Sequence, residues 1–569
     1  MRRVATDGGS GAEAERSDAP DARSKRPQQR YVVGMPRYYW IFGVVAIALL
    51  GLALRLHGIH NPLLDHPGWR QGDTGAIARN FARLQFDIMR PQTMYDGPPP
   101  NYVELELQIV PFIAAILYKI FGIHEVFGRL VSIAFSLGTV VALAYFGRWL
   151  FTSAIAGLLA GFFYAVFPGS VYYGRTFMPD AAMVFFLTAA LYACARYLIE
   201  STRILTRGLA LSTVLLTLAY LAKPVAVLAL APLGGMLWQR LRRRRALPLV
   251  SGGILIVVPL LVLWLYDRRV AAYAEWHWAS GITRLHVMPA LMTAFEHAGA
   301  FAAKASQFAA ALGMLPDTML GRIAFAITIA SLVALPWIDA RSKALLWGWL
   351  VGGLVYAYVV VTVERVDYYL YPLLPLCALV MGGALARYLG GVSRADAAPP
   401  ARYALMILVP AIAIAVLAQS RSAVAAYYRY DKQVYRNAVA LNADLSKDAI
   451  VVIGHYGPNV QYYIDRFGWE EDPAVWTPYD EESAIRKGAR YFISIEDRRM
   501  RANRDLCVWL QRFPLQAGVE PWPIYRTDPA LASSGGDALW RAFRRAERAG
   551  AGAAFLQRRG LCGLTTRSP

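Results

Sequence analysis

Long apolar runs separated by short polar segments form the main pattern of this chain. The runs start near Tyr38, Val126, Ile155, Phe177, Leu209, Pro224, Leu247, Arg322, Ala344, Tyr368 and Tyr403. Each approaches the ~20 apolar residues that a helix needs to cross a bilayer. The pattern therefore predicts a mainly α protein, with a polytopic transmembrane helical bundle of about 11 spans over residues 38–420.

The charged residues between the runs indicate how this bundle sits in the membrane. Arginines crowd two short loops, 196–207 and 240–245, and recur over 387–402. Short loops rich in Lys and Arg face the cytoplasm in membrane proteins. We therefore expect a multi-pass protein of the bacterial inner membrane with a cytoplasmic N-terminus, and with loops 57–124 and 267–320 on the exterior side.

The composition supports this class and excludes another. Of the 569 residues 56% are hydrophobic and 17% charged, which is too apolar for an ordinary soluble multidomain protein. The net charge of +20 would suit nucleic-acid binding, but the basic residues are distributed as topology signals. The lipid bilayer is therefore an expected partner and nucleic acid is not.

The two ends of the chain differ from the bundle. Residues 1–37 are polar and lack the apolar core of a signal peptide, so we expect a disordered cytoplasmic tail. Residues 421–569 have the composition of a soluble periplasmic domain. Apolar β-type runs at 449–453 and 491–495 alternate with helical patterns at 458–466 and 481–489, which predicts a small α/β fold.

The four cysteines divide by environment. Cys194 and Cys377 lie within apolar runs and are expected to be inert packing residues, whereas Cys507 and Cys562 fall in the predicted exterior domain. An oxidising exterior permits a disulfide between the latter two, and the sequence leaves open whether it forms. The cysteine spacing gives no metal motif.

The first exterior loop, 57–124, is too long for a turn. Ile77, Phe81 and Leu84 recur at helical spacing beside arginines, which predicts an amphipathic helix lying at the membrane interface. A second apolar segment, 103–121, follows. We expect it to be either another surface helix or a shallow re-entrant one.

Carboxylates on the exterior side are the candidate catalytic groups. A sugar transferase at a membrane needs a base for the acceptor hydroxyl and cations for a departing lipid phosphate. The candidate acids are Asp73, Glu104 and Asp180, with Glu106 competing with Glu104. The candidate cations are Arg70, Arg79, Arg175, Lys223 and Arg365. A helix-capping role is the alternative for Asp73 and Asp180, and snorkelling to lipid headgroups is the alternative for each arginine.

The order of these motifs resembles a known family. Gly72-Asp73-Thr74, then Tyr102-Val103-Glu104, then Pro179-Asp180 at the start of a span are similar to the GT-C membrane glycosyltransferases. The chain is most similar there to the glycosyltransferase 39 group, which includes protein mannosyltransferases and the lipid A aminoarabinose transferase. The run 367–375, which holds Tyr368, resembles an aromatic-proline segment of that group.

This resemblance implies roles for the residues that match it. Asp73 takes the place of the family's first-loop catalytic acid, Glu104 that of its second, and Asp180 that of the acid opening the fourth span. Tyr368 is then a substrate-binding residue, and the donor is a polyprenyl-phosphate sugar. The chain departs from the family at Leu105, where the aminoarabinose transferase has a lysine.

The sequence thus favours a hexosyl or pentosyl transferase that moves a sugar from a polyprenyl-phosphate donor to a lipid, glycan or protein acceptor on the exterior face. Two alternatives stay open: a polysaccharide polymerase or ligase using a lipid diphosphate donor, and a non-enzymatic transporter or flippase. The position of the acids at span ends, away from the bilayer midplane, favours interfacial chemistry over transport. No cofactor is required, and a divalent cation where Asp73 and Asp180 converge is left open.

Overall fold

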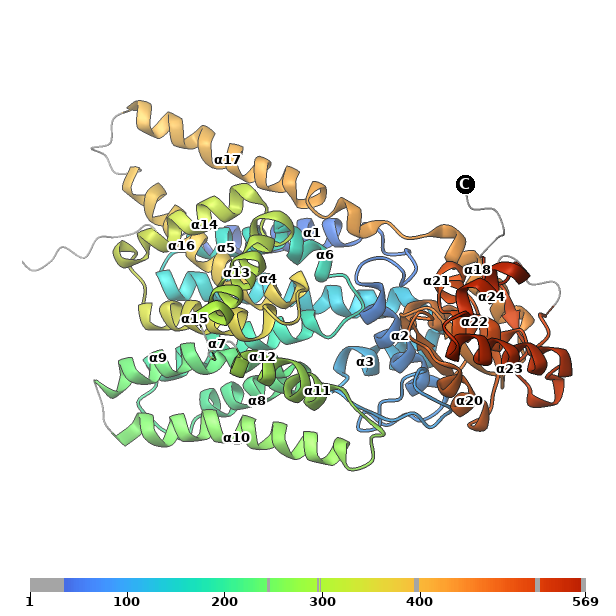
Figure 1. Ribbon diagram of the computed structural model, residues 1–569. Coiled ribbons are helices and arrows are strands. Elements are labelled where there is room, and N and C mark those ends of the chain that lie inside the picture. The colour runs from blue at the N-terminus through green and yellow to red at the C-terminus, as the bar shows by residue number, and fades with distance from the viewer. Residues whose placement is uncertain are drawn as a thin grey trace, which may run out of the picture.

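A computed structural model of the chain describes residues 35–242, 246–293, 296, 298–392, 399–516 and 522–563. The predicted N-terminal tail lies outside the described residues, except for its last three positions. The membrane bundle and the C-terminal domain lie at opposite ends of the molecule (Figure 1). Loop 57–124 lies between them; we call it the first exterior loop, and loop 267–320 the second, after the side predicted for them.

Within the described residues, eight helical segments are long and apolar enough to cross a membrane. They contain α1 (Arg37–Arg55), α4 (Glu125–Phe151), α7 (Asp180–Glu200), η1 with α9 (Pro224–Ala229, Leu230–Leu241), α10 (Ala246–Ala271), α15 with η5 (Lys343–Tyr356, Ala357–Val361), η6 with α16 (Asp367–Leu373, Leu374–Val392) and α17 (Pro399–Ser422). Most run side by side in Figure 1, and α17 follows the edge of the bundle toward the C-terminal domain.

Four shorter apolar helices accompany them. They are α3 (Ile109–Phe121), α5 (Ala154–Val166), α8 (Arg207–Ala222) and α14 with η4 (Arg322–Ala334, Leu335–Trp337). The last three coincide with predicted apolar runs, and the eight long segments coincide with the others. The bundle itself is confirmed, while the exact number of spans stays a prediction.

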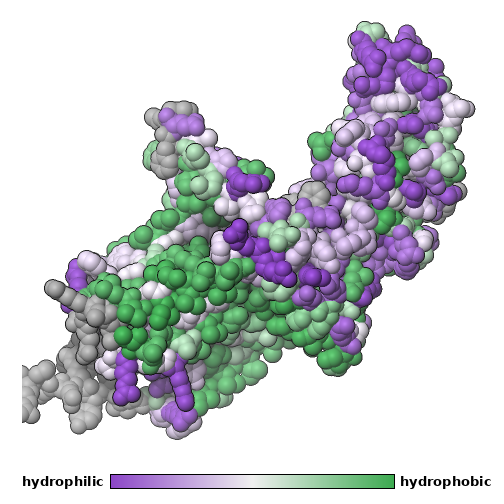
Figure 2. All heavy atoms as spheres, turned by 90° about the horizontal axis from the view of Figure 1, so that it is seen from below, coloured by the Kyte–Doolittle hydropathy of each residue, from purple (hydrophilic) through white to green (hydrophobic). Residues whose placement is uncertain are grey.

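The surface has the polarity of a multi-pass membrane protein. Hydrophobic residues cover the bundle in Figure 2, and hydrophilic residues cover the part that projects at the right, which is the C-terminal domain. Exposed apolar side chains such as Phe42 and Val257 lie on spanning helices, and Val333 lies on the shorter apolar helix α14. Lipid is the environment that satisfies such a surface.

The first exterior loop folds into α2 (Gly68–Arg83), α3 and the short strand β1 (Val103–Glu104). The helix predicted from Ile77, Phe81 and Leu84 exists, but its predicted place at the membrane interface is wrong. Residues 71–81 of α2 are all buried, because α3 covers one side and the C-terminal domain covers another. Segment 103–121 is strand followed by helix.

The second exterior loop contains a strand and several short helices. They are β2 (Trp276–His277), α11 (Trp278–Gly281), η2 (Ile282–Val287), α12 (Met288–Thr293), α13 (Ala298–Met314) and η3 (Leu315–Met319). β2 pairs in parallel with β1, with Glu104 opposite His277. This pairing joins the two exterior loops.

The C-terminal domain is the predicted α/β unit. Its sheet has the order β4-β3-β5-β6, parallel except at the β5–β6 edge. The elements are α18 (Lys432–Asp444), β3 (Ile450–Gly454), α19 (Pro458–Ile464), β4 (Gly468–Glu471), α20 (Pro478–Arg486), β5 (Ala489–Ile493), α21 (Asp497–Ala502), α22 (Arg504–Leu510), β6 (Ile524–Tyr525), α23 (Ser534–Arg548) and α24 (Gly552–Arg559). The expected β-runs and helices are confirmed within a few residues.

Cys507 and Cys562 form a disulfide, and Cys194 and Cys377 are buried free thiols.

The domain's sheet continues into the first exterior loop. The Gly97 amide donates to the Gly468 carbonyl (3.0 Å), and the Gly468 amide donates to the Met94 carbonyl (3.0 Å). Gln461 of α19 also donates to the Met94 carbonyl (2.8 Å). Segment 94–97 is therefore held by the edge of β4.

Candidate active site

Asp73 lies on the second turn of α2 and is fully buried. Its Oδ2 accepts from Arg70 (2.6 Å), and its Oδ1 accepts from the Tyr95 hydroxyl (3.1 Å). The other arm of Arg70 pairs with Glu106. Spacing i,i+3 on one helix face brings Arg70 and Asp73 together. One guanidinium thus links two of the acids that the sequence singled out.

The capping alternative for Asp73 is wrong. Pro67 is the N-cap residue of α2, and Asp73 lies six residues farther along. Burial raises the pKa of the Asp73 carboxyl, although the Arg70 charge opposes this shift. A buried carboxylate with a raised pKa accepts a proton more readily than an ordinary aspartate.

Asp180 is the first residue of α7 and is also fully buried. Its Oδ1 accepts from the Lys223 ammonium (2.8 Å), and its buried Oδ2 has no partner among the described residues. Lys223 lies over the rings of Tyr368 and Tyr369, 4.9 and 4.7 Å from their centroids. Among the described residues neither oxygen of Asp180 accepts from a backbone amide, so the capping alternative is wrong here too.

Glu104 meets the second exterior loop. Its Oε2 contacts His277 Nδ1 (3.1 Å) and accepts from the Ser280 hydroxyl (2.7 Å). Its Oε1 is buried with no partner in the described part of the chain. Because β1 and β2 align Glu104 with His277, the loops at 57–124 and 267–320 meet at this carboxylate.

Arg70 is the centre at which these groups converge. Although burial alone would lower the pKa of its guanidinium, the charges of Glu106 and Asp73 raise it, and Tyr368 and Asp180 add to that effect. The structure therefore brings Asp73, Arg70, Asp180 and Lys223 into one site together with Tyr368. Glu106, Tyr95 and Tyr369 join them, while His277 and Ser280 contact Glu104. None of these five had a settled role on the sequence alone.

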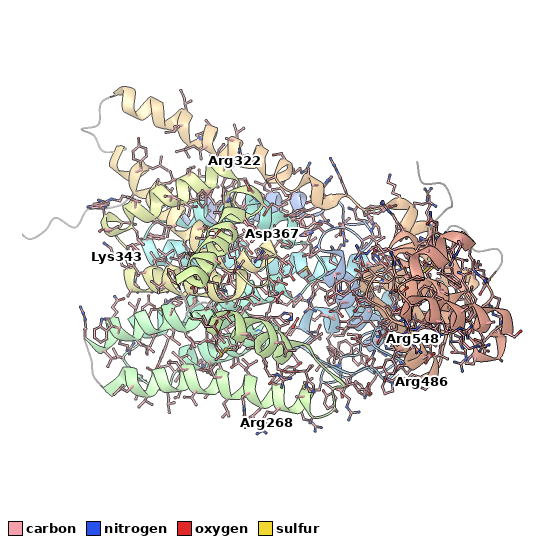
Figure 3. The ribbon with its side chains drawn as sticks, viewed as in Figure 1. Arg268, Arg322, Lys343, Asp367, Arg486 and Arg548 are labelled. Atoms are coloured by element: carbon pink, nitrogen blue, oxygen red, sulfur yellow. A yellow bond between two sulfur atoms is a disulfide. The ribbon has the colours of Figure 1, made fainter. Side chains whose placement is uncertain are left out.

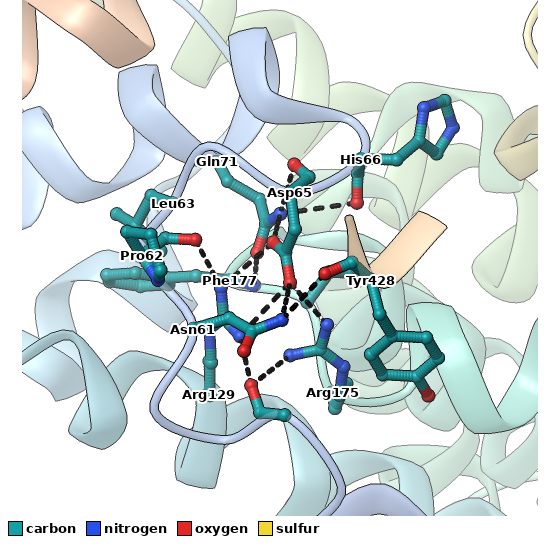
Figure 4. Close-up of polar contacts among 12 residues, drawn as sticks. Asn61, Pro62, Leu63, Asp65, His66, Gln71, Arg129, Arg175, Phe177 and Tyr428 are labelled. Carbon is teal, nitrogen blue, oxygen red and sulfur yellow. Dashed lines mark hydrogen bonds and ion pairs between the residues drawn. The ribbon is translucent and has the colours of Figure 1, made fainter. Parts of the chain in front are cut away.

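Arg175 lies in a separate polar cluster that Figure 4 shows. Asp65, Arg129 and Arg175 are fully buried there, and Asp65 pairs with both guanidiniums, at 3.0 and 2.5 Å. Burial alone would raise the pKa of Asp65, but the two arginine charges outweigh it and lower the pKa. Both arginines also donate to the Gly58 carbonyl (2.8 Å each), so this cluster fixes the start of the first exterior loop.

Arg79 faces the C-terminal domain. Its guanidinium donates to the Tyr462 carbonyl (2.8 Å), pairs with Asp465 (3.1 Å) and stacks on the Tyr462 ring (4.1 Å). Arg365 is exposed and lies in the segment between η5 and η6. Of the five candidate cations, Arg70 and Lys223 therefore contact the candidate acids, and the other three lie elsewhere.

Asp367 is a buried acid that the sequence analysis did not single out. It accepts from Thr318 (2.6 Å), Tyr427 (2.7 Å) and Tyr173, and His66 lies 3.7 Å away. Figure 3 places it inside the bundle, in contrast to peripheral residues such as Arg322. Its partners come from four separate segments, which gave no local sequence signal.

Two further buried carboxyl groups approach Asp73, Asp96 of the first exterior loop and Glu470 of the C-terminal domain. Burial, and then the charge of Glu471, raises the pKa of Asp96 to about 7. Burial raises the pKa of Glu470 to about 9, and the charges of Asp96, Glu471 and Asp73 contribute in the same direction. Glu470 lies on β4, so the sheet edge that holds segment 94–97 also brings an acid toward the candidate base.

The described residues contain no group of three or more His, Cys, Asp or Glu side chains arranged to hold a metal ion. Asp73 and Asp180, which the sequence analysis considered for a divalent cation, each pair with a cationic side chain of the protein.

Known proteins share this architecture. Residues 108–266 match the family described as dolichyl-phosphate-mannose-protein mannosyltransferase. The fold resembles the oligosaccharyltransferase AglB of Archaeoglobus fulgidus in complex with an inhibitory peptide and a dolichol-phosphate, with a TM-score of 0.57 at 13% identity over 86% of this chain and 74% of AglB. It also resembles ArnT of Cupriavidus metallidurans bound to undecaprenyl phosphate, with a TM-score of 0.54 at 13% identity over 87% of this chain and 99% of ArnT.

The chain has the same fold as these two proteins, the GT-C fold. The GT-C resemblance inferred from the order of the acidic motifs is thereby confirmed. No curated protein matches the sequence. At 13% identity the likeness to AglB and ArnT establishes the fold alone. The roles of individual residues have to come from the geometry of this chain.

Proposed function

We propose that this protein transfers a sugar from a polyprenyl-phosphate donor to a lipid, glycan or protein acceptor, with Asp73 as the general base. The observation that carries the proposal is the fully buried Asp73 carboxylate, held between Arg70 and Tyr95 beside the Asp180–Lys223 pair. Support for the donor class comes from the relatives, one bound to undecaprenyl phosphate and one to a dolichol-phosphate.

The proposed reaction uses the groups at this site as follows. The acceptor hydroxyl oxygen attacks the anomeric carbon, and its proton passes to Asp73. The bond between the anomeric carbon and the phosphate oxygen breaks, and its electron pair stays with the phosphate. Arg70 and Lys223 are the cations that stabilise the growing phosphate charge. Tyr368 and Tyr369 hold Lys223 in place through their ring faces.

Glu104 is assigned to substrate positioning in this proposal. Its free Oε1 is available to accept from a sugar hydroxyl, while His277 and Ser280 fix its other oxygen. The free Oδ2 of Asp180 is the corresponding acceptor on the other side of the site. Sugars offer several hydroxyl donors, so two fixed carboxylate oxygens favour a defined orientation of the donor.

The proposed orientation has the C-terminal domain and this site outside the cytoplasm, in the bacterial inner membrane. The C-terminal ends of α7 and α9, which lead into the basic stretches 196–207 and 240–245 of the sequence, lie at the end of the bundle away from the C-terminal domain (Figure 1). Positive loops face the cytoplasm in such proteins. Site-directed labelling of single cysteines introduced into the domain of intact cells tests this orientation.

The decisive experiment measures release of free polyprenyl phosphate from labelled polyprenyl-phosphate sugars, using the purified full chain in lipid with envelope extract as acceptor source. We expect Asp73→Asn to lower release by about 10² to 10⁴-fold, because general-base assistance is lost. Asp87→Asn in the same loop is the control and should keep full activity. Equal release by Asp73→Asn and the unmodified chain would overturn the proposal.

A further inference from the structure

α13 lies against the bundle with one charged residue on its inner side. Phe301 points outward and is 53% exposed, and its neighbours 302 and 303 are exposed alanines. Lys304 points inward and is only 4% exposed. An apolar outer face suits contact with lipid, so Lys304 is a cation held between a lipid-facing helix and the bundle.

The ammonium of Lys304 has no hydrogen-bond partner among the described residues. Its Nζ lies over the ring of Tyr358 in η5, 5.6 Å from the ring centroid. The hydroxyl of Tyr358 is likewise buried and without a partner in the described structure. Two adjacent buried polar groups left unsatisfied are rare in folded proteins and call for a ligand.

The charged group that affects Lys304 is a second cation, Arg365. Burial, and then the charge of Arg365, lowers the pKa of the Lys304 ammonium. Arg365 is exposed, and its recorded contact is a long one, 3.4 Å from Nε to the Thr362 carbonyl. Two cations and a free hydroxyl at one place are complementary to an anion with several acceptor oxygens.

The helix α13 that carries Lys304 and the helix α15 that leads into η5 also line an apolar pocket of about 150 Å³. Its lining includes Leu312, Leu315, Phe325, Ile329, Leu354 and Leu373. Leu354 is one helical turn from Tyr358, and Leu312 is two turns, or about 12 Å, from Lys304 along α13. A polar head at Lys304 would thus have an apolar cavity in reach for the start of a chain.

We propose that Lys304, Tyr358 and Arg365 form a second lipid-phosphate site, separate from the pair Arg70 and Lys223, with the first part of the lipid chain in the adjacent pocket. The ligand class is a lipid phosphate monoester, which carries a charge of about −1.5 to −2 near neutral pH and so matches two cations. Its two sources are polyprenyl phosphate freed by transfer and phosphatidic acid of the bilayer.

The test is direct binding without turnover, so that its failure leaves the transfer reaction untouched. A short-chain polyprenyl phosphate is titrated into the purified full chain in phosphatidylcholine nanodiscs, and bound equivalents are counted by native mass spectrometry. We expect two equivalents for the unmodified chain and one for Lys304→Met with Arg365→Gln, whose second site weakens at least about tenfold. Arg322→Gln, an exposed cation on neighbouring α14, is the control.

Two further binding measurements identify the ligand. Polyprenol, which lacks the phosphate, should not occupy the second site, and competition by phosphatidic acid distinguishes the bilayer source from the freed carrier. Lys304→Met alone should keep or raise the thermal midpoint, because it removes an unpaired buried charge. Two equivalents bound with unchanged affinity by the double variant, or equal binding of polyprenol, would overturn the proposal.

Discussion

Gly72 of α2 lies against the backbone of Asn459 in the C-terminal domain. A Cβ added at Gly72 would overlap the Asn459 Cα and lie 2.6 Å from its backbone nitrogen. Gly72 directly precedes Asp73. The C-terminal domain is thus in backbone contact with the helix turn that carries the candidate base. One to two turns farther along α2, Arg79 makes a second contact with the domain through Tyr462 and Asp465.

We predict that Gly72→Ala lowers transfer on the order of 10²-fold, because the new methyl group pushes the α2 turn away from Asn459 and displaces Asp73. The measurement is release of polyprenyl phosphate at saturating donor. Gly234→Ala in α9 is the matched control, since a Cβ there meets nothing within 4 Å. Full activity of Gly72→Ala would show that the contact does not position the carboxylate.

Variants of the Asp180–Lys223 pair can distinguish its contribution to stability from its contribution to activity. Lys223→Met leaves the buried Asp180 charge unpaired and should cost about 3 to 5 kcal/mol of unfolding free energy together with activity. Adding Asp180→Asn should restore much of the stability, seen in the thermal midpoint, because no unpaired charge remains. Activity should stay lost. Recovery of both in the double variant would assign the pair a structural role only.

Stability should depend on pH through Glu470. Its folded pKa of about 9 lies above the ordinary value of 4.5, so over this range the folded state keeps a proton that the unfolded state has lost. The free energy of unfolding therefore falls as pH rises, by at most about 1.4 kcal/mol per unit, and levels off above the folded pKa. Glu470→Gln should flatten thermal midpoints measured from pH 5 to pH 9, with exposed Asp444→Asn as control.

The disulfide should stabilise the C-terminal domain. Cys507 and Cys562 are 55 residues apart, and closing a loop of that length corresponds to about 4 kcal/mol. We predict that Cys507→Ala with Cys562→Ala lowers the thermal midpoint of the domain. The buried thiols Cys194 and Cys377 should leave it unchanged when each is replaced by Ala. An equal midpoint with and without reductant in the unmodified chain would contradict this prediction.

Chelation tests the divalent-cation question. Asp73 and Asp180 already pair with Arg70 and Lys223, so we expect transfer to continue in excess EDTA. The measurement is the same release assay, with added Mg²⁺ or Mn²⁺ as the comparison. Activity lost on chelation and regained with one of these ions would place a metal at the site.

The bundle could be predicted from the sequence because each span is a continuous apolar run, and a run of that length is enough by itself to indicate a helix in lipid. The same reasoning failed for α2. Its apolar and polar positions fit a helix half exposed at the interface, but α19, which covers its other side, comes about 390 residues later along the chain. The spacing of apolar residues along a helix does not show which distant segment covers its polar side.

The candidate site was predictable in part for the same reason. The acids Asp73, Glu104 and Asp180 could be selected from their order relative to the spans. Their partners could not, because Glu104 and His277 are 173 residues apart and meet only through the β1–β2 pairing. The segment that holds Lys304 and the segment that holds Tyr358 are likewise brought together only by the fold.

The hydrogen bonds between segment 94–97 and the edge of β4 have a consequence for protein engineering. A chimera that exchanges the C-terminal domain at residue 421 would replace one side of a shared sheet and leave the other side behind. The unit that can be transplanted is therefore the domain together with the first exterior loop. Because that loop also carries Asp73, the soluble domain and the reaction chemistry are expected to be inherited as one module.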